Sequence, residues 1–184
     1  MALTASQNFA MGTPAPDFSL PNTIDGKSLS LQELKGEKGT AIFFICNHCP
    51  YVIHINAALV KLAQDYVDQG VSFIAISSND TKRYPQDGPE NMKRMAAQMG
   101  YPFPYLFDES QDVARAYEAA CTPDLYLFDA DLKAVYRGQF DDTRPRSGMP
   151  ATGADFRQAL DHLLAGKGAL EMQRPSVGCS IKWK

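Results

Sequence analysis

Runs of apolar residues between turn signals predict alternating strands and helices in the first half of the chain. Five consecutive apolar residues over 41–45 are typical of a strand that is buried on both faces. The segment that follows has apolar residues three or four positions apart: Val52, Ile55, Leu59, Ala63 and Tyr66. This spacing predicts an amphipathic helix that ends near 68–70. A second apolar run over 71–76 predicts another buried strand, parallel to the first because a helix connects them.

The rest of the chain adds further elements around this unit. In order, the pattern predicts a helix over 89–100, an edge strand over 105–107, a short helix over 111–119, a hairpin of strands over 125–128 and 134–140, and a helix over 154–164. Prolines and an Asp25-Gly26 turn predict an N-terminal β-hairpin within 13–34 that caps the edge of the sheet. The tail over 166–184 has weak periodicity but an apolar end, so we expect it to dock on the domain.

Length and charge limit the classes of protein to consider. The 184 residues contain no long polar linker, and we predict one domain over 1–184. The net charge of −3, the sequence pI near 5.6 and the absence of basic runs disfavour nucleic acid and anionic membranes as partners. Residues 1–17 lack the pattern of a signal peptide, and nowhere do about 18 apolar residues follow one another. We therefore expect a cytoplasmic protein that acts on a small molecule or another protein.

The chain contains four cysteines, too few for a fold that disulfides hold together. Two of them, Cys46 and Cys49, fall on the turn between the first buried strand and its helix. At such a turn, unpaired backbone N–H groups and the positive end of the helix dipole stabilise a thiolate, the nucleophile of disulfide chemistry. A zinc site would need two further ligands, and no second Cys-x-x-Cys or His-x-x-His motif is present. The sequence predicts a redox-active dithiol with no bound metal or cofactor.

The order of these elements resembles the thioredoxin fold, with Cys-x-x-Cys at the start of the first helix and Thr122-Pro123 opening a later strand. The opening over 12–18 and the ending over 178–184 are similar to redoxins of the alkyl hydroperoxide reductase/thiol-specific antioxidant superfamily, in particular a peroxiredoxin-like subgroup with Cys-x-x-Cys. The resemblance implies a thioredoxin-like α/β fold with a central mixed sheet flanked by helices. It also implies that the bond between Thr122 and Pro123 is cis and that these residues bind substrate opposite the dithiol.

The resemblance also implies roles for individual residues. Cys46, at the first and exposed position of the turn, is expected to be the nucleophile, and Cys49 the resolving thiol. His48 precedes the second cysteine as in the Dsb-type oxidases, so we expect it to make the dithiol more oxidising than that of thioredoxin. Asn47 and Pro50 complete the residues that tune the site.

The two remaining cysteines leave alternatives open. Cys121, two residues before Pro123, is either an additional redox thiol or a buried small hydrophobic residue beside the site. Cys179, on the docked tail, is either a C-terminal resolving cysteine of the kind that some peroxiredoxins use or a packed thiol.

Three functions follow, in order of preference. The first is a thiol-disulfide oxidoreductase that exchanges disulfides with a protein or small-molecule thiol partner and with a cellular thiol reductant, without a cofactor. The second is a thiol-dependent peroxidase, an antioxidant enzyme. When the peroxiredoxin motif is aligned on Cys49, Cys46 stands where that motif has a hydroxyl residue. The third is a metal-binding module similar to the copper-assembly proteins of this fold, which use Cys-x-x-x-Cys and a distant histidine.

Overall fold

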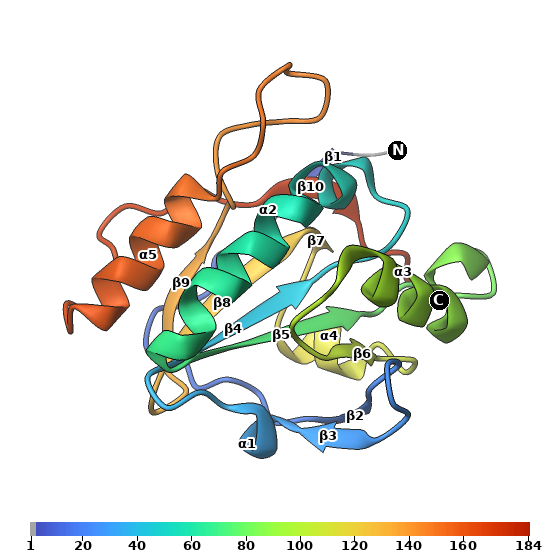
Figure 1. Ribbon diagram of the computed structural model, residues 1–184, viewed down its shortest axis with the longest axis horizontal. Helices are drawn as coiled ribbons and strands as arrows, with labels where there is room; N and C mark the ends of the chain where they lie inside the picture. Colours follow the sequence, from blue (N-terminus) through green and yellow to red (C-terminus); the bar gives the residue numbers. More distant parts are fainter. Residues whose placement is uncertain (1–2) are drawn as a thin grey trace.

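A five-stranded mixed sheet forms the centre of the structure, a computed structural model that describes residues 3–184 (Figure 1). Its strands lie in the order β6 (Tyr105–Phe107), β5 (Val71–Ser77), β4 (Gly39–Phe44), β8 (Asp124–Asp129) and β9 (Ala134–Gly138). β4, β5 and β6 are parallel, whereas β8 runs antiparallel to β4, and β9 antiparallel to β8. The parallel pair, the edge strand and the second hairpin that the sequence predicts are therefore confirmed.

Helices cover both faces of this sheet. One face carries α2 (Pro50–Tyr66), its continuation η1 (Val67–Gln69), α3 (Pro89–Met99) and α5 (Ala154–Leu164). The other carries α1 (Leu31–Leu34), α4 (Asp112–Ala116) and the hairpin of β2 (Ser19–Pro21) and β3 (Ser28–Ser30). Side chains of the central strands alternate between the faces, so that Phe43 packs with the first group and Phe44 with the second. The apolar run over 41–45 is thus a strand buried on both faces, as predicted.

The N-terminal hairpin lies against the edge of the sheet. β2 and β3 pair antiparallel across a short turn. Asn22 forms a β-bridge with Leu106 of β6, and the backbone N–H of Thr23 donates to the Tyr105 carbonyl at 3.0 Å. These contacts cover the open edge of β6, which confirms the predicted capping role of the hairpin.

The start of α2 follows from the residues around the cysteine motif. Cys49 is the N-cap, with extended backbone, and Pro50 takes the first helical position, where its fixed φ and missing N–H suit a helix. After Tyr66 and η1 the chain turns at Gly70, whose φ of 90° is a conformation that glycine adopts freely. The turn that contains Cys46 therefore lies at the carboxyl end of β4, with the amino end of α2 directly after it.

The C-terminal tail docks as a strand. β10 (Val177–Ser180) lies between β1 (Leu3–Ala5) and β7 (Cys121–Thr122) in a three-stranded antiparallel sheet. Beyond β10, the backbone N–H of Lys182 donates to the Asn79 side chain at 2.8 Å. The predicted docking of the tail is confirmed. Its pairing as a strand is not visible in its own periodicity, because two strand edges from distant parts of the chain determine it.

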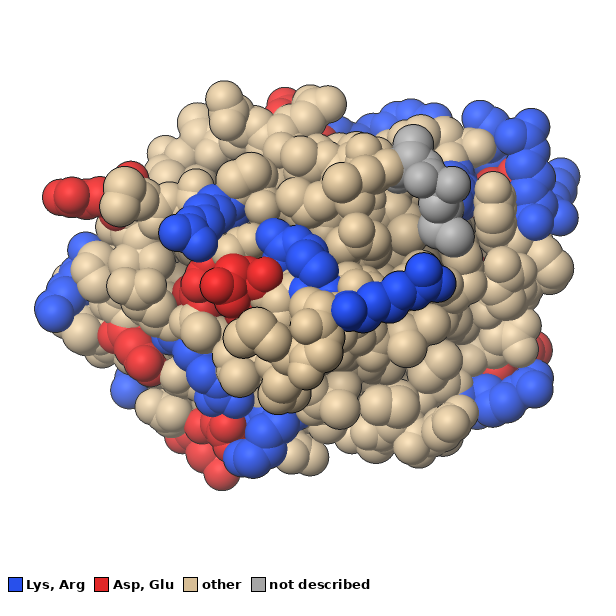
Figure 2. Space-filling view, turned by 90° about the horizontal axis from the view of Figure 1, so that it is seen from above, with Lys and Arg blue, Asp and Glu red and all other residues tan. Residues whose placement is uncertain are grey.

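The described residues contain no membrane-spanning helix, and the face shown in Figure 2 has no basic stripe. Within residues 3–184, no helix is long and apolar enough to cross a bilayer. On the face shown in Figure 2, Lys and Arg side chains are dispersed, and acidic side chains lie among them. This pattern differs from the continuous basic stripe with which proteins bind a phosphate backbone.

A buried ion pair joins β8 to β9. The Arg137 guanidinium lies 2.9 Å from the Asp124 carboxylate, and the exposed fractions of the two side chains are 2% and 0%. In Asp124→Ala the guanidinium would stay buried without its counter-charge, so we expect the free energy of unfolding to fall by about 3–5 kcal/mol. Chemical denaturation measures this change. The exposed Asp142 provides the control, because Asp142→Ala should change stability by no more than about 0.5 kcal/mol. Equal effects of the two variants would contradict the importance of the pair.

Candidate redox site

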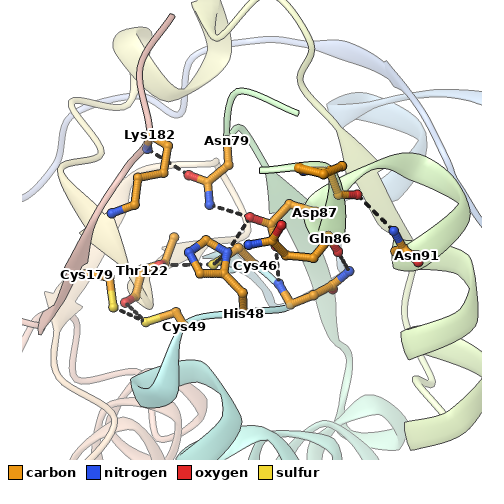
Figure 3. A network of polar contacts seen from close by, with 12 residues as sticks. Cys46, His48, Cys49, Asn79, Gln86, Asp87, Asn91, Thr122, Cys179 and Lys182 are labelled. Atoms are coloured by element: carbon orange, nitrogen blue, oxygen red, sulfur yellow. Dashed lines mark hydrogen bonds and ion pairs between the residues drawn. The ribbon is translucent and has the colours of Figure 1, made fainter. Parts of the chain in front are cut away.

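Three segments that are distant in the sequence meet at the amino end of α2, and two of them bring sulfur atoms together there (Figure 3). The turn between β4 and α2 supplies Cys46 and Cys49, β7 supplies Thr122, and β10 supplies Cys179. All four cysteines of the chain are thiols in this structure, and all are buried. The sequence-predicted dithiol therefore lies inside the protein, next to a third sulfur.

Cys46 is enclosed by polar side chains. Its Sγ lies 3.4 Å from the Thr122 hydroxyl and 3.9 Å from Nδ1 of His48. Only 1% of Cys46 is exposed, so the expectation that it occupies an exposed position is wrong. The reason is the segment after β5, which folds over the turn: Tyr84 stacks on the His48 ring with centroids 5.2 Å apart, and Asp87 binds the turn from the same side.

Cys49 lies deeper and faces the tail. Its Sγ lies 3.1 Å from the Thr122 carbonyl oxygen and 2.7 Å from Sγ of Cys179. The exposed fractions of Cys49 and Cys179 are 0% and 3%. A backbone strand, rather than side chains that can rotate, covers this sulfur on the side of β10 (Figure 3).

The site divides protons unequally between the paired cysteines. A hydrogen bond from the Cys46 thiol, and a further one from the Cys179 thiol, lower the pKa of Cys49 to about 5 despite its burial. The backbone N–H of Val52 in the first turn of α2 adds to this stabilisation. The pKa of Cys46 is raised well above its ordinary value by its hydrogen bond to Cys49, by burial and by the negative charge of Asp87. In the dithiol form, Cys49 therefore carries the charge and Cys46 the proton.

Asp87 is a functional residue that sequence reasoning missed. It is fully buried and accepts hydrogen bonds from the Asn47 backbone N–H at 2.8 Å, from the Asn79 side chain at 2.9 Å and from His48 Nδ1 at 2.6 Å. The imidazole is thus held by Asp87, and its Nδ1 lies closer to this carboxylate, at 2.6 Å, than to the Cys46 sulfur, at 3.9 Å. The sequence shows only a polar, turn-rich segment over 77–88, and nothing in it indicates a partner for His48.

The other residues expected to tune the site lie beside it. The Asn47 side chain donates to the Gln86 carbonyl at 2.8 Å and accepts from the Tyr105 hydroxyl at 3.1 Å, which ties the turn to η2 (Pro85–Asp87) and β6. Pro50 is exposed at the start of α2, without direct contact to a sulfur among its described interactions. Asn47 thus fixes the position of the turn, and Pro50 favours the helical conformation at the start of α2.

The Thr122-Pro123 bond is cis, as the family resemblance implies. The backbone edge next to it is already occupied, because Thr122 pairs with Cys179 and Cys121 with Ser180 in the β7–β10 ladder. The substrate-binding role expected for Thr122 and Pro123 stays a prediction, and in this structure the tail stands where an extended substrate would pair.

Cys121 makes its described hydrogen bond to the backbone and not to a sulfur of the Cys46–Cys49 pair. Its Sγ donates to the Pro123 carbonyl at 3.5 Å, and burial raises the pKa of its thiol, as does the charge of Asp124. A thiol in such surroundings is inert. The geometry favours the alternative in which Cys121 is a buried small hydrophobic residue.

One set of side chains has the residue types of a metal site. Ligand atoms of Cys46, His48 and Asp87 all lie within 4.8 Å of one another. Within residues 3–184, no fourth His, Cys, Asp or Glu joins this set, whereas a structural zinc site has four protein ligands. The close hydrogen bond between His48 and Asp87 occupies Nδ1 of the imidazole, the nitrogen that lies within reach of Cys46. The arrangement therefore fits a carboxylate-supported imidazole better than a metal site.

Comparisons with known sequences identify relatives with related chemistry. The family model described as "AhpC/TSA family" matches residues 11–137. Thiol-disulfide oxidoreductase ResA from Halalkalibacterium halodurans is 30% identical over 130 residues, which are 69% of this chain and 68% of that protein. The chain thus spans about two thirds of the length of this curated relative.

Solved structures match over a larger part of the chain. An uncharacterized conserved protein from Geobacillus kaustophilus is 58% identical, with a TM-score of 0.97 and coverage of 100% of this chain and 97% of that one. A hypothetical protein from Sinorhizobium meliloti 1021 is 46% identical, with a TM-score of 0.95 and coverage of 98% of both chains.

A more distant structure identifies the fold. A thioredoxin-family thiol:disulfide interchange protein from Chlorobium tepidum TLS is 22% identical, with a TM-score of 0.64 and coverage of 85% of this chain and 99% of that one. At this identity the likeness concerns the fold alone. The predicted thioredoxin-like α/β fold, with its mixed sheet, N-terminal hairpin and docked tail, is confirmed.

Proposed function

The chain belongs to the AhpC/TSA family, and we propose that it is a thiol-disulfide oxidoreductase whose Cys46–Cys49 pair cycles between dithiol and disulfide. The observation that carries the proposal is the placement of both cysteines at the amino end of α2, with Cys46 3.4 Å from the Thr122 hydroxyl and Cys49 2.7 Å from the Cys179 sulfur. The hydrogen bond between the two thiols lowers the pKa of Cys49 to about 5 and raises that of Cys46. A thiol with a low pKa is a good leaving group in disulfide exchange. No cofactor is needed, because the cysteines themselves hold the electrons.

The surroundings of the two sulfurs support different roles for them. Cys46 is enclosed by the side chains of His48 and Thr122, whereas Cys49 lies beneath the β10 strand. We therefore assign Cys46 as the sulfur that bonds to the partner. Cys49 is the sulfur that leaves when the disulfide is attacked, and that resolves the mixed disulfide when the reaction runs in reverse.

In the oxidising direction, the Cys46–Cys49 disulfide oxidises two partner thiols in two steps. A partner thiolate attacks Sγ of Cys46, the Cys46–Cys49 bond breaks, and Cys49 leaves as a thiolate. A second partner thiolate then attacks the partner sulfur of the mixed disulfide, so that the partner disulfide forms and Cys46 leaves and takes up a proton. The partner loses two electrons and the protein gains them. Stabilisation of the Cys49 thiolate favours this direction, because it stabilises the reduced protein.

The occupied β7 edge favours a particular kind of partner. While β10 pairs with Cys121 and Thr122, an incoming peptide cannot add to the same edge as a strand. A small thiol, or a cysteine on a flexible segment of a protein, can approach Cys46 without strand pairing. These two partner types correspond to the thiol substrates expected from the sequence.

Glutathione disulfide provides a defined test of the assigned roles. Cys49→Ser should retain one glutathione on Cys46, because the resolving sulfur is absent, whereas the wild-type protein should lose the adduct and form an internal disulfide. Intact-mass measurement without reductant distinguishes these products. Cys46→Ser is the matched control and should retain no adduct. An adduct retained by Cys46→Ser and absent from Cys49→Ser would overturn the assignment of roles.

A peroxidase function has one observation in its favour. The acidic Cys49 has a second sulfur, that of Cys179, 2.7 Å away, which could resolve a sulfenic acid. Within residues 3–184, however, no arginine donates a hydrogen bond to Cys46 or Cys49 and thereby completes a peroxide-binding site. Consumption of hydroperoxide with dithiothreitol as the reductant, faster than reduction of a disulfide substrate, would favour this antioxidant function over disulfide exchange.

A further inference from the structure

We propose that Cys179 is a third redox cysteine, and that the Cys46–Cys49 disulfide isomerises within the chain to a Cys49–Cys179 disulfide. The inference rests on the proposed function, because the Cys46–Cys49 disulfide is its starting point. It extends that function by giving the C-terminal strand β10 the role of an internal substrate.

The pairing of β10 with a strand on each side fixes the contact between Cys49 and Cys179. β10 is held in register between two strands, so that Cys179 lies opposite Leu3 of β1 and opposite Thr122 of β7. The Thr122 carbonyl oxygen also lies 3.1 Å from Sγ of Cys49, so both sulfurs lie beside the same residue. Their separation of 2.7 Å compares with about 2.05 Å for a covalent disulfide bond. A small shift of the two side chains therefore forms the bond.

Glycine at position 178 makes this approach possible. A Cβ atom at Gly178 would overlap the Thr122 carbonyl oxygen and would press on Cδ of Pro123. With no side chain there, β10 can lie directly on the backbone that precedes the cis proline, and the next residue, Cys179, projects toward Cys49. The Gly178-Cys179 pair thus fits β7 as an extended, cysteine-containing substrate would.

The exchange needs no external oxidant. Sγ of Cys179 attacks Sγ of Cys49, the Cys49–Cys179 bond forms and the Cys46–Cys49 bond breaks. Cys46 leaves and takes up a proton, and the proton of Cys179 is released, so that the number of electrons in the protein does not change. Cys46 readily takes up a proton when it leaves, because its pKa is raised. Burial also raises the pKa of Cys179, to about 12. One buried thiol is therefore exchanged for another.

The exchange would change what the oxidised protein exposes to its partner. In the Cys46–Cys49 form, the partner meets a disulfide at Cys46. In the Cys49–Cys179 form, β10 is covalently attached to α2, and Cys46 is a thiol that cannot accept a partner thiolate. The disulfide would thereby be stored between Cys49 and Cys179 of the tail strand. Attack of Cys46 on Cys49 would form the Cys46–Cys49 disulfide again.

Peptide mapping tests the proposal in the full-length protein. Trypsin places Cys46 and Cys49 together in the peptide 39–61 and Cys179 in the peptide 168–182. After oxidation by glutathione disulfide, alkylation and digestion without reductant, we expect wild-type protein to give a crosslink between these peptides and alkylated Cys46. Cys179→Ser should give only the disulfide within 39–61. Cys121→Ser is the matched cysteine control and should give the wild-type pattern.

A second variant keeps the test independent of the starting disulfide. Cys46→Ser, oxidised by diamide, a small oxidant of paired thiols, should form the same crosslink between 39–61 and 168–182. Absence of this crosslink from both the wild-type protein and Cys46→Ser would overturn the role of Cys179. Absence of the disulfide within 39–61 from Cys179→Ser would instead overturn the proposed function, so the two failures are distinguishable.

Discussion

Reduced protein is expected to titrate one cysteine with an apparent pKa of about 5, which corresponds to about a 10⁴-fold increase in acidity over the ordinary value of 9.0. The cause is the set of donors around Cys49: first the Cys46 thiol, then the Cys179 thiol and the N–H of Val52. Ultraviolet absorbance of the thiolate as a function of pH measures this ionisation. Cys49→Ser should abolish the transition, and Cys46→Ala should raise its midpoint more than Cys179→Ala does, because Cys46 is the stronger donor.

The sign of the pH dependence follows from the direction of this shift. A thiol whose pKa is lower in the folded than in the unfolded protein contributes its full stabilisation above the unfolded value. This contribution decreases as the pH falls from about 9 toward about 5 and is absent below that range. The denaturation midpoint of the reduced protein should therefore fall over this range relative to that of Cys49→Ser. A thiolate transition near pH 9 in the wild-type protein would contradict the assignment of the charge to Cys49.

The same stabilisation bears on the reduction potential. Because the reduced form is stabilised, equilibration with glutathione should give a potential above the value of about −270 mV known for thioredoxin. The sequence attributes this effect to His48. In the structure, the His48 imidazole donates to Asp87, while thiol and backbone donors surround Cys49. His48→Ala should therefore change the potential less than Cys179→Ala does.

Local patterns were sufficient to predict most of the fold. The apolar run over 41–45 and the spacing after it identify a buried strand and an amphipathic helix, because burial imposes these periods on the residues themselves. The Pro50 and Gly70 positions mark the start and end of the helical segment for equally local reasons. A strand such as β10 is different: its few residues pair because β1 and β7 present open edges, which its own sequence does not record.

The candidate site was predictable only in part for the same reason. The Cys-x-x-Cys motif at a strand-to-helix turn indicates a dithiol, and the resemblance adds the cis bond before Pro123. The burial of Cys46 and the location of the charge on Cys49 depend instead on Asp87 and Cys179, which are distant in the sequence from the motif. These long-range contacts add to the hydrogen bond between the two cysteines of the motif, and no spacing within the motif encodes them.

Release of the C-terminal tail is expected to have the second large effect, on the accessibility of Cys49. Gly178→Val is expected to weaken the pairing of β10 with β7, because a side chain at this position overlaps the Thr122 carbonyl. If the overlap costs about 3 kcal/mol, local opening of the tail, and with it alkylation of Cys49 in the reduced protein, should increase by about 100-fold. The rate of iodoacetamide incorporation into the peptide 39–61 measures this change.

Ser180→Ala is the matched control on the same strand, because it keeps the backbone pairing of β10 while it removes a hydroxyl that contacts Lys182. Its alkylation rate should stay near that of the wild-type protein. The single tryptophan, Trp183, packs against Arg115 at 4.7 Å just beyond β10, so its fluorescence should change in Gly178→Val but not in Ser180→Ala. Far-UV circular dichroism separates local release of the tail from global unfolding. Equal alkylation rates for both variants would show that β10 does not limit access to Cys49, and its role as an internal substrate would then lack a physical basis.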